Sequence, residues 1–234
     1  MAHDLVIRNG TVIDGTGSPG YEADVAIDGE KIAVIGKNLG SGKKEIDAKG
    51  HVVAPGFIDS HTHMDAFVVQ YPNGNPVVNY GVTSIVIGDC GASCAPVPQK
   101  PEPRKVLVEY LRRVLDKYVD DKDWKWNTFA EYLNYIEGRI SVNVLPLMPH
   151  SPVRLTVMGE AAYQREANAE ELAAMKKWCA RAWSWAPSVF RRVRAAVRRF
   201  MPARRAPSQR TMKSSNWPTS PPIITAASSS TVSR

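Results

Sequence analysis

Three short apolar runs, each followed by a histidine or a cysteine, constrain most strongly what this chain can fold into. The runs occupy residues 52–59, 82–87 and 140–147. Stretches with apolar residues at helical spacing lie between and after them, at residues 103–118, 128–138 and 167–183. Apolar strands that alternate with helices are typical of βα units around a parallel sheet. The sequence therefore predicts an α/β fold for residues 56–182.

Two of the predicted helices carry start signals. Thr128 is followed three residues later by Glu131, and Asn168 is followed in the same way by Glu171. In such a capping box, each of the two side chains accepts a hydrogen bond from the other residue's backbone. We therefore expect helices to begin after residues 128 and 168. Cys179 falls on the apolar face of the second of these helices, so we expect it to pack in the interior.

The pattern is different before residue 56. Residues 4–53 read as short strands that alternate with turn residues. Asn9-Gly10 predicts a turn, and Asp28-Gly29 predicts a two-residue hairpin loop. We expect a small all-β unit over residues 1–55.

The strongest chemical signal follows the first apolar run, where His61 and His63 are two residues apart. Because side chains alternate along a strand, the two imidazoles point the same way, as do Asp59 and, if the strand continues, Asp65. Two neutral imidazoles this close can bind one divalent cation, with carboxylates nearby to orient them or share the metal. The alternative is a solvated strand end with two ordinary histidines. The carboxyl ends of parallel strands form the active-site rim in βα architectures, which favours the metal site.

Two further residues follow the other apolar runs. Cys90 stands between glycines directly after the second run, and a thiolate is a good zinc ligand. The alternative for Cys90 is a small buried thiol at a turn, which is the commoner fate of a cysteine. His150 follows the third run and is expected at the same rim. Cys94, His3 and His51 lack comparable surroundings and are assigned no role.

The charge of the chain is uneven. The formal net charge is +7, but Arg181 to Arg234 holds 11 Lys/Arg and no Asp/Glu, which leaves 19 basic and 23 acidic residues in 1–180. The bulk of the chain is thus slightly acidic, which gives no electrostatic case for nucleic acid. No basic segment followed by a long apolar one opens the chain, and no stretch approaches the roughly 18 apolar residues that span a bilayer. With only three cysteines, these features predict a cytoplasmic protein with reduced thiols.

Several motifs resemble one enzyme family. Residues 55–65, PGFIDSHTHMD, resemble the first metal-binding strand of the amidohydrolase superfamily, and residues 5–15, LVIRNGTVIDG, resemble its N-terminal β segment. Residues 86–96, VIGDCGASCAP, are similar to the D-aminoacylase (N-acyl-D-amino-acid deacylase) branch, and TFAEYL at 128–133 and PHSPVR at 149–154 fit the same branch. The resemblance ends near residue 182.

This resemblance implies a fold and a reaction. The fold is a TIM-like (β/α)8 metal-dependent hydrolase barrel, with its first βα units in residues 56–182 and part of a small β-sandwich in residues 1–55. The reaction is hydrolysis of a small-molecule N-acyl-D-amino acid by water that one or two Zn²⁺ ions activate. By the same resemblance, His61 and His63 are ligands of one metal position and Cys90 of the tighter one. His150 lies near the substrate, and Asp59 supports the ligands.

The resemblance also predicts an incomplete protein. A full barrel has eight strands in about 250 residues, whereas residues 57–182 supply three recognisable ones. The family's later histidine ligands and catalytic aspartate are expected beyond residue 182, yet no histidine follows His150 and no Asp or Glu follows Glu171. The prediction is a linear-amide hydrolase, truncated and weakly active or inactive. The alternatives are a non-catalytic fragment with residual metal binding, and a cyclic-amide hydrolase of the hydantoinase kind, whose metals a carboxylated lysine typically bridges.

Residues 183–234 form a basic tail rich in Pro, Ser and Arg. One interpretation is an arm whose arginines surround an apolar helical face and bind an acidic surface or an anionic membrane. The preferred interpretation is a frameshift near residue 183, because a GC-rich gene read out of frame yields excess Arg, Ala, Pro and Ser with few carboxylates. We therefore expect no regular structure in this tail.

Overall fold

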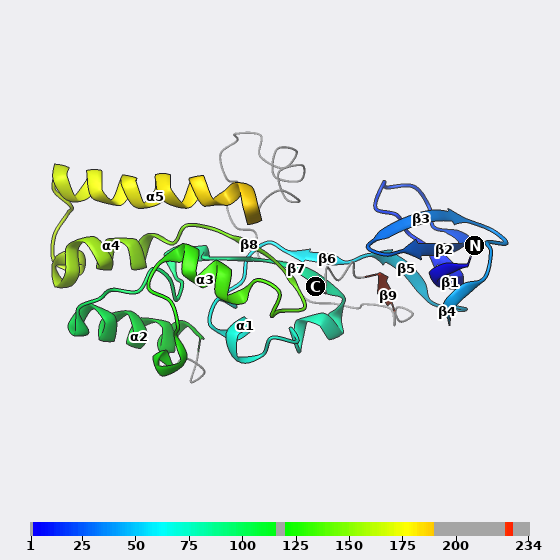
Figure 1. Ribbon diagram of the computed structural model, residues 1–234, viewed down its shortest axis with the longest axis horizontal. Coiled ribbons are helices and arrows are strands. Elements are labelled where there is room, and N and C mark those ends of the chain that lie inside the picture. The colour runs from blue at the N-terminus through cyan, green and yellow to red at the C-terminus, as the bar shows by residue number, and fades with distance from the viewer. Residues whose placement is uncertain (1, 116–119, 190–222, 227–234) are drawn as a thin grey trace, which may run out of the picture. The chain divides into compact units, whose positions relative to one another are not determined.

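The computed structural model describes residues 2–115, 120–189 and 223–226 of the chain, which folds into two compact units. The second unit begins at Ile58 and holds the described helices (Figure 1). The first unit holds strands β1 (His3–Val12), β2 (Tyr21–Asp28), β3 (Lys31–Gly36), β4 (Gly42–Asp47), β5 (Val52–Pro55) and β9 (Ile223–Ala226).

These six strands form one mixed sheet around the long strand β1. β2 pairs antiparallel with β1, and β3 pairs antiparallel with β2. On the other edge of β1, the parallel strand β4 pairs with its first part and β5 with its last two residues, while β9 runs parallel to β5. The predicted hairpin is confirmed, but its two-residue loop is Gly29-Glu30 and not Asp28-Gly29, because Asp28 pairs with Lys31; Gly29 has a φ of 58°.

The predicted turn at Asn9-Gly10 is wrong, because β1 runs through both residues. The register with β2 shifts between Ile7 and Gly10, and Asn9 has a φ of 59°, so the feature is a β-bulge. Asparagine tolerates this left-handed conformation, and its backbone N–H donates to an Asp24 carboxylate oxygen at 3.0 Å. A Cβ on Gly10 would lie 2.5 Å from a methyl carbon of Val53, so only glycine allows β5 to approach this closely.

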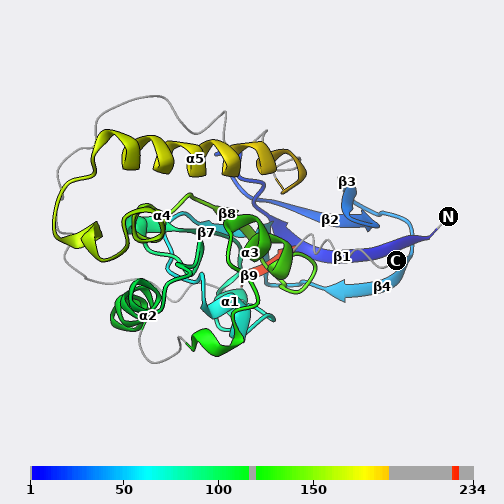
Figure 2. The same ribbon diagram turned by 60° about the vertical axis from the view of Figure 1, so that its left-hand side comes forward.

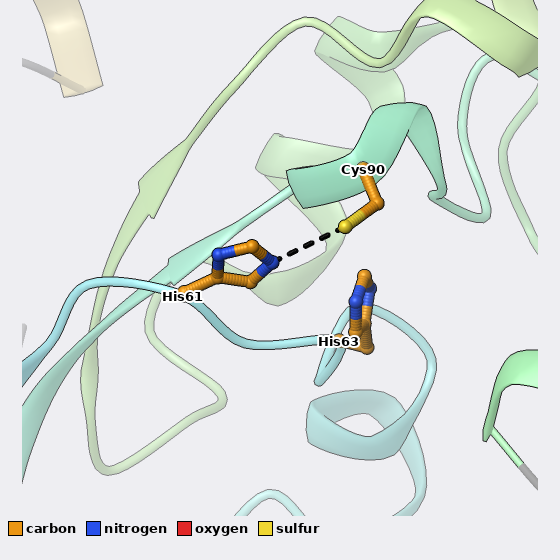
Figure 3. Close-up of side chains that lie close together, drawn as sticks. All are labelled: His61, His63 and Cys90. Carbon is orange, nitrogen blue, oxygen red and sulfur yellow. Dashed lines mark hydrogen bonds between the residues drawn. The ribbon is translucent and has the colours of Figure 1, made fainter. Parts of the chain in front are cut away.

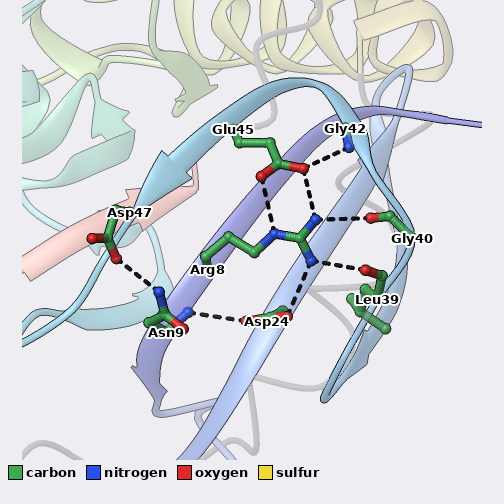
Figure 4. A network of polar contacts seen from close by, with 8 residues as sticks. All are labelled: Arg8, Asn9, Asp24, Leu39, Gly40, Gly42, Glu45 and Asp47. Atoms are coloured by element: carbon green, nitrogen blue, oxygen red, sulfur yellow. Dashed lines mark hydrogen bonds and ion pairs between the residues drawn. The ribbon is translucent and has the colours of Figure 1, made fainter.

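Arg8 ties the loop before β4 to the sheet (Figure 4). Its guanidinium donates to both carboxylate oxygens of Glu45, at 2.6 and 3.2 Å, and to Asp24 at 3.2 Å. It also donates to the carbonyl oxygens of Leu39 at 2.9 Å and Gly40 at 3.0 Å. One side chain therefore fixes β2, β4 and the connection that leads into β4.

The second unit has a three-stranded sheet in the order β6-β7-β8, with β7 and β8 parallel and Ile85 opposite Val144. Its strands are β6 (Phe57–Asp59), β7 (Val82–Ile87) and β8 (Asn143–Pro146). Its helices are α1 (Phe67–Gln70), α2 (Pro101–Leu115), α3 (Phe129–Ile136), α4 (His150–Met158) and α5 (Ala169–Val189). The predicted alternation of strands and helices is thus confirmed, although β8 is shorter than the predicted run because Ser141 instead bonds to Pro72 O.

Both predicted capping boxes are present. Thr128 Oγ1 accepts from the N–H of Glu131, whose carboxylate accepts from the N–H of Thr128. Asn168 and Glu171 make the same reciprocal pair, at 2.8 and 2.9 Å. Helices α3 and α5 therefore begin where their sequences indicate.

The core of the second unit lies between its sheet and its helices. Ile85 and Ile87 of β7 are fully buried, as are Leu107 and Leu111 of α2 and Tyr132 of α3. Helix α4 contacts both α2 and α5 (Figures 1 and 2). This packing holds the carboxyl ends of β7 and β8 in fixed relation.

The structure describes two parts of the tail that was expected to lack regular structure. Helix α5 continues to Val189, six residues past the predicted end, and β9 lies beside β5. The frameshift and the arginine-rich arm concern mainly residues that lie outside the described ranges. Among the described residues, none of the helices has the length and apolar character needed to cross a membrane.

Candidate metal centre

The two histidines lie just beyond strand β6, in a segment that is tied to β7. Thr62, between them, donates from its N–H and its hydroxyl to the Val86 carbonyl oxygen, at 3.1 and 2.6 Å. Thr62 is buried, whereas His61 is exposed and His63 is half-buried. The alternation predicted from the sequence therefore continues past the strand, with the hydroxyl on one side and both imidazoles on the other.

Cys90 is presented by a tight turn after β7. Gly88 has a φ of 86°, and Cys90 itself has a φ of 52° in the short 3-10 helix Asp89–Gly91. A Cβ on Gly88 would lie 2.4 Å from the carbonyl oxygen of Leu147, so this position requires glycine for both its conformation and its close approach to the chain after β8. The turn leaves the Cys90 side chain exposed.

These elements bring three potential metal ligands together (Figure 3). The ligand atoms of His61, His63 and Cys90 all lie within 4.8 Å of one another. His61 Nε2 is 3.2 Å from Cys90 Sγ, and the two imidazole centroids are 5.6 Å apart at an interplanar angle of 70°. Within the described ranges, no other three His, Cys, Asp or Glu side chains converge in this way.

The chemistry of this group fits zinc. Two imidazoles and one thiolate are ligands that zinc prefers, and three protein ligands leave a fourth tetrahedral position for water or substrate. Buried Nδ1 of His63 has no hydrogen-bond partner among the described residues, so the ring is not committed to a structural contact through that atom. His61, His63 and Cys90 would hold the ion.

His150 and Asp59 lie outside this group. His150 is the first residue of α4 and is exposed; its Cβ would lie 3.3 Å from a Cβ on Gly91, which places it beside the turn that carries Cys90. Asp59 accepts a hydrogen bond from the backbone N–H of His61 at 3.2 Å, so it contacts the main chain and not the imidazole. Their predicted roles near substrate and ligands remain predictions.

Sequence reasoning missed the environment of Asp65. Asp65 was placed on the side of the histidines only if the strand continued. β6 ends at Asp59, and the Asp65 side chain is 1% exposed in the interior. Burial raises the pKa of Asp65 to about 6, against the opposing effects of the Ser93 hydroxyl and the Gly88 amide. The sequence feature that could have drawn attention to Asp65 is its position two residues after His63.

The other two cysteines are not part of the group. Cys94 is buried and its carbonyl oxygen accepts a hydrogen bond from the Trp126 indole at 2.8 Å; burial raises the pKa of its thiol. Cys179 is exposed on α5, so the expectation that it packs in the interior is wrong. Met175, one turn earlier on the same face, is buried, whereas Leu172 is exposed as Cys179 is.

With this geometry in view, the comparisons with known proteins define the class of the chain. The model of the amidohydrolase family matches residues 44–210, so the chain belongs to that family. The D-aminoacylase of Alcaligenes xylosoxydans xylosoxydans is 37% identical over 175 residues, which is 74% of this chain and 34% of that protein. The N-acyl-D-glutamate deacylase of the same organism is 38% identical over 76% of this chain and 34% of its own length. The predicted resemblance to the D-aminoacylase branch is confirmed.

A solved structure extends the comparison. The N-acyl-D-glutamate deacylase of Bordetella bronchiseptica, complexed with zinc and a phosphonate that mimics the tetrahedral intermediate, matches with a TM-score of 0.65 and 30% identity over 76% of this chain and 35% of that one. The chain thus spans about a third of the length of the relatives it matches. Those relatives are named D-aminoacylase and N-acyl-D-glutamate deacylase, so they do not favour the cyclic-amide alternative.

Proposed function

We propose that this chain contributes a zinc centre to the hydrolysis of N-acyl-D-amino acids, which yields a carboxylate and a free D-amino acid. The observation that carries the proposal is the convergence of His61, His63 and Cys90 within 4.8 Å, from two segments that follow different strands. The relatives' names support the substrate class.

Each side chain has a distinct part in this proposal. Zinc, when bound, polarises the amide carbonyl and lowers the pKa of water. His61, His63 and Cys90 would hold one ion together; where two ions bind, His61 and His63 would be ligands of one position and Cys90 of the tighter one. His150, exposed beside the Cys90 turn, contacts the substrate, and Asp59 fixes the backbone of His61 through its 3.2 Å hydrogen bond.

Two further expectations belong to this proposal. The second unit forms the first βα units of a TIM-like barrel, which the parallel pairing of β7 with β8 and the TM-score of 0.65 support. The protein works in the cytoplasm, because a reducing compartment keeps a thiolate ligand such as Cys90 available.

The test measures zinc affinity and turnover on the purified chain. Zinc affinity is determined by competition with a chromophoric chelator, and release of D-amino acid is followed with N-acetyl-D-amino acids and their L-enantiomers. We expect His63→Ala and Cys90→Ser to weaken zinc binding strongly. His51→Ala is the matched control, because within the described ranges the printed hydrogen bond of its ring is to the Lys49 carbonyl oxygen, in the first unit. Wild-type protein that binds no zinc would contradict the proposal.

A second function, metal binding without turnover, is kept because the described residues bring together three metal ligands while His150 stands outside the group. The same assay separates the two. Zinc binding with D-selective release of amino acid supports the enzyme, whereas zinc binding without release supports a metal-binding fragment.

A further inference from the structure

Asp65 is the most deeply buried charged side chain that the described residues contain. It is 1% exposed, while the next such residue, Asp24, is 9% exposed and hydrogen bonded to Arg8. Burying a carboxyl group costs free energy unless its oxygens are satisfied by donors. A buried Asp65 therefore needs an explanation in terms of what its two oxygens do.

One oxygen of Asp65 reaches the turn that carries Cys90. Its Oδ2 accepts from the backbone N–H of Gly88 at 3.4 Å, two residues before Cys90. On the other side of His63, Thr62 donates to the Val86 carbonyl oxygen at 2.6 Å. The segment around His63 is thus fastened to the end of β7 both before and after the histidine, and Asp65 makes the second of these attachments.

The other oxygen of Asp65 has no partner. Asp65 Oδ1, His63 Nδ1 and the Ser93 hydroxyl are all buried and all lack a hydrogen-bond partner among the described residues. The Ser93 hydroxyl acts on the Asp65 carboxyl, and His63 lies only two residues before Asp65 in the chain. In this inference Nε2 of His63 binds the ion, and the buried, unpartnered Nδ1 is the second nitrogen of the ring. Nδ1 then carries the proton and needs an acceptor, which ligating histidines usually find in a carboxylate, a backbone carbonyl or water.

We propose that Asp65 is a positioning residue of the metal centre, whose carboxyl accepts from the Gly88 amide with one oxygen and from the His63 Nδ1–H, directly or through a buried water, with the other. This inference rests on the proposed zinc binding. Asp65 is not one of the three converging ligands. Its buried carboxyl instead fixes the distance between the His63 segment and the Cys90 turn, and it orients the His63 ring.

Asp65→Asn is the sharpest test, because the side chains have the same size but an amide offers one acceptor oxygen where a carboxylate offers two. We expect zinc affinity to fall by about 10- to 100-fold, while the variant unfolds at a temperature no lower than wild type because the buried charge is gone. Cobalt in place of zinc gives a second readout, since a displaced Cys90 alters the thiolate-to-cobalt charge-transfer absorption. Asp65→Ala, which lacks both acceptors, should bind zinc more weakly still.

Tyr132→Phe is the matched control. Its hydroxyl donates to the backbone carbonyl oxygen of Asp65 at 2.7 Å in the same buried region, so the variant loses a hydrogen bond to Asp65 but leaves the carboxyl intact. It should lower thermal stability with little change in zinc affinity. If Asp65→Asn binds zinc as wild type does, the positioning role is overturned and the zinc centre stands. If wild type binds no zinc, the proposed function fails and the positioning role fails with it.

Discussion

His61 Nε2 lies 3.2 Å from Cys90 Sγ, although the two residues are 29 positions apart in the chain. The contact joins the segment after β6 to the turn after β7, and it leaves the thiol accessible. A metal-bound thiolate is shielded from alkylating reagents, while a free exposed one reacts. The state of this sulfur therefore reports on the metal centre.

We predict that zinc protects Cys90 from alkylation by iodoacetamide. Without zinc, Cys90 and Cys179 should both be modified, because both are exposed, whereas buried Cys94 should stay unmodified in the native protein. With zinc, only the rate at Cys90 should fall, by at least an order of magnitude. Peptide mass spectrometry measures each rate, and equal protection of Cys179 would point to aggregation instead of ligation.

Gly88→Ala should destabilise the second unit and weaken zinc binding. A left-handed residue with a Cβ costs roughly 1–2 kcal/mol, and the new Cβ would lie 2.4 Å from the Leu147 carbonyl oxygen, so the backbone must also shift. Gly138→Ala is the matched control, because Gly138 has a φ of 69° and no atom within 4 Å of an added Cβ. Thermal unfolding of the two variants should show a distinctly larger loss at Gly88.

How much of this structure the sequence predicts depends on the range of the interactions. The hairpin at Gly29 and the caps at Thr128 and Asn168 are local, because the residues that form them lie within a few positions of one another. The convergence of His61 and Cys90 was inferred from a shared position at strand ends, which the parallel pairing of strands turns into proximity. Local patterns and one topological rule were sufficient for these features.

Features that depend on distant contacts were missed. Asn9-Gly10 has turn chemistry, but pairing of β1 with β2 and the Asp24 carboxylate turn it into a bulge within a strand. Asp65 was placed on the side of the histidines only if the strand continued, and β6 ends at Asp59. Its burial depends on Gly88 and Tyr132, which lie 23 and 67 residues away in the chain. No periodicity in the sequence encodes such contacts.

Arg8→Lys should lower the melting temperature of the first unit nearly as much as Arg8→Ala. A lysine carries the charge but lacks the planar fork that bonds both Glu45 oxygens together with Asp24 and two loop carbonyls. Lys43→Ala serves as the control, since its pair with Asp4 is solvent-exposed and such pairs contribute little. Differential scanning calorimetry measures the shifts, and a lysine variant as stable as wild type would mean that charge alone suffices.

Glu171 should make the stability of the second unit depend on pH on the acid side. The Arg165 guanidinium, and then the Asn168 amide, hold the pKa of Glu171 at about 2, below its ordinary value of 4.5. An acid with a lowered pKa in the folded state stabilises that state above its unfolded pKa, and this contribution is lost as pH falls from about 4.5 towards 2. Glu171→Gln should therefore be less stable than wild type near pH 7, and the difference should shrink over that acid range.

Glu170→Gln removes the same charge from the same helical turn without touching Arg165 and should follow the wild-type profile. Denaturant unfolding across the pH range, monitored by helical circular dichroism, measures the stability of each variant. If the difference in stability between Glu171→Gln and wild type stays constant with pH, the charge of the carboxylate is not what stabilises the start of α5.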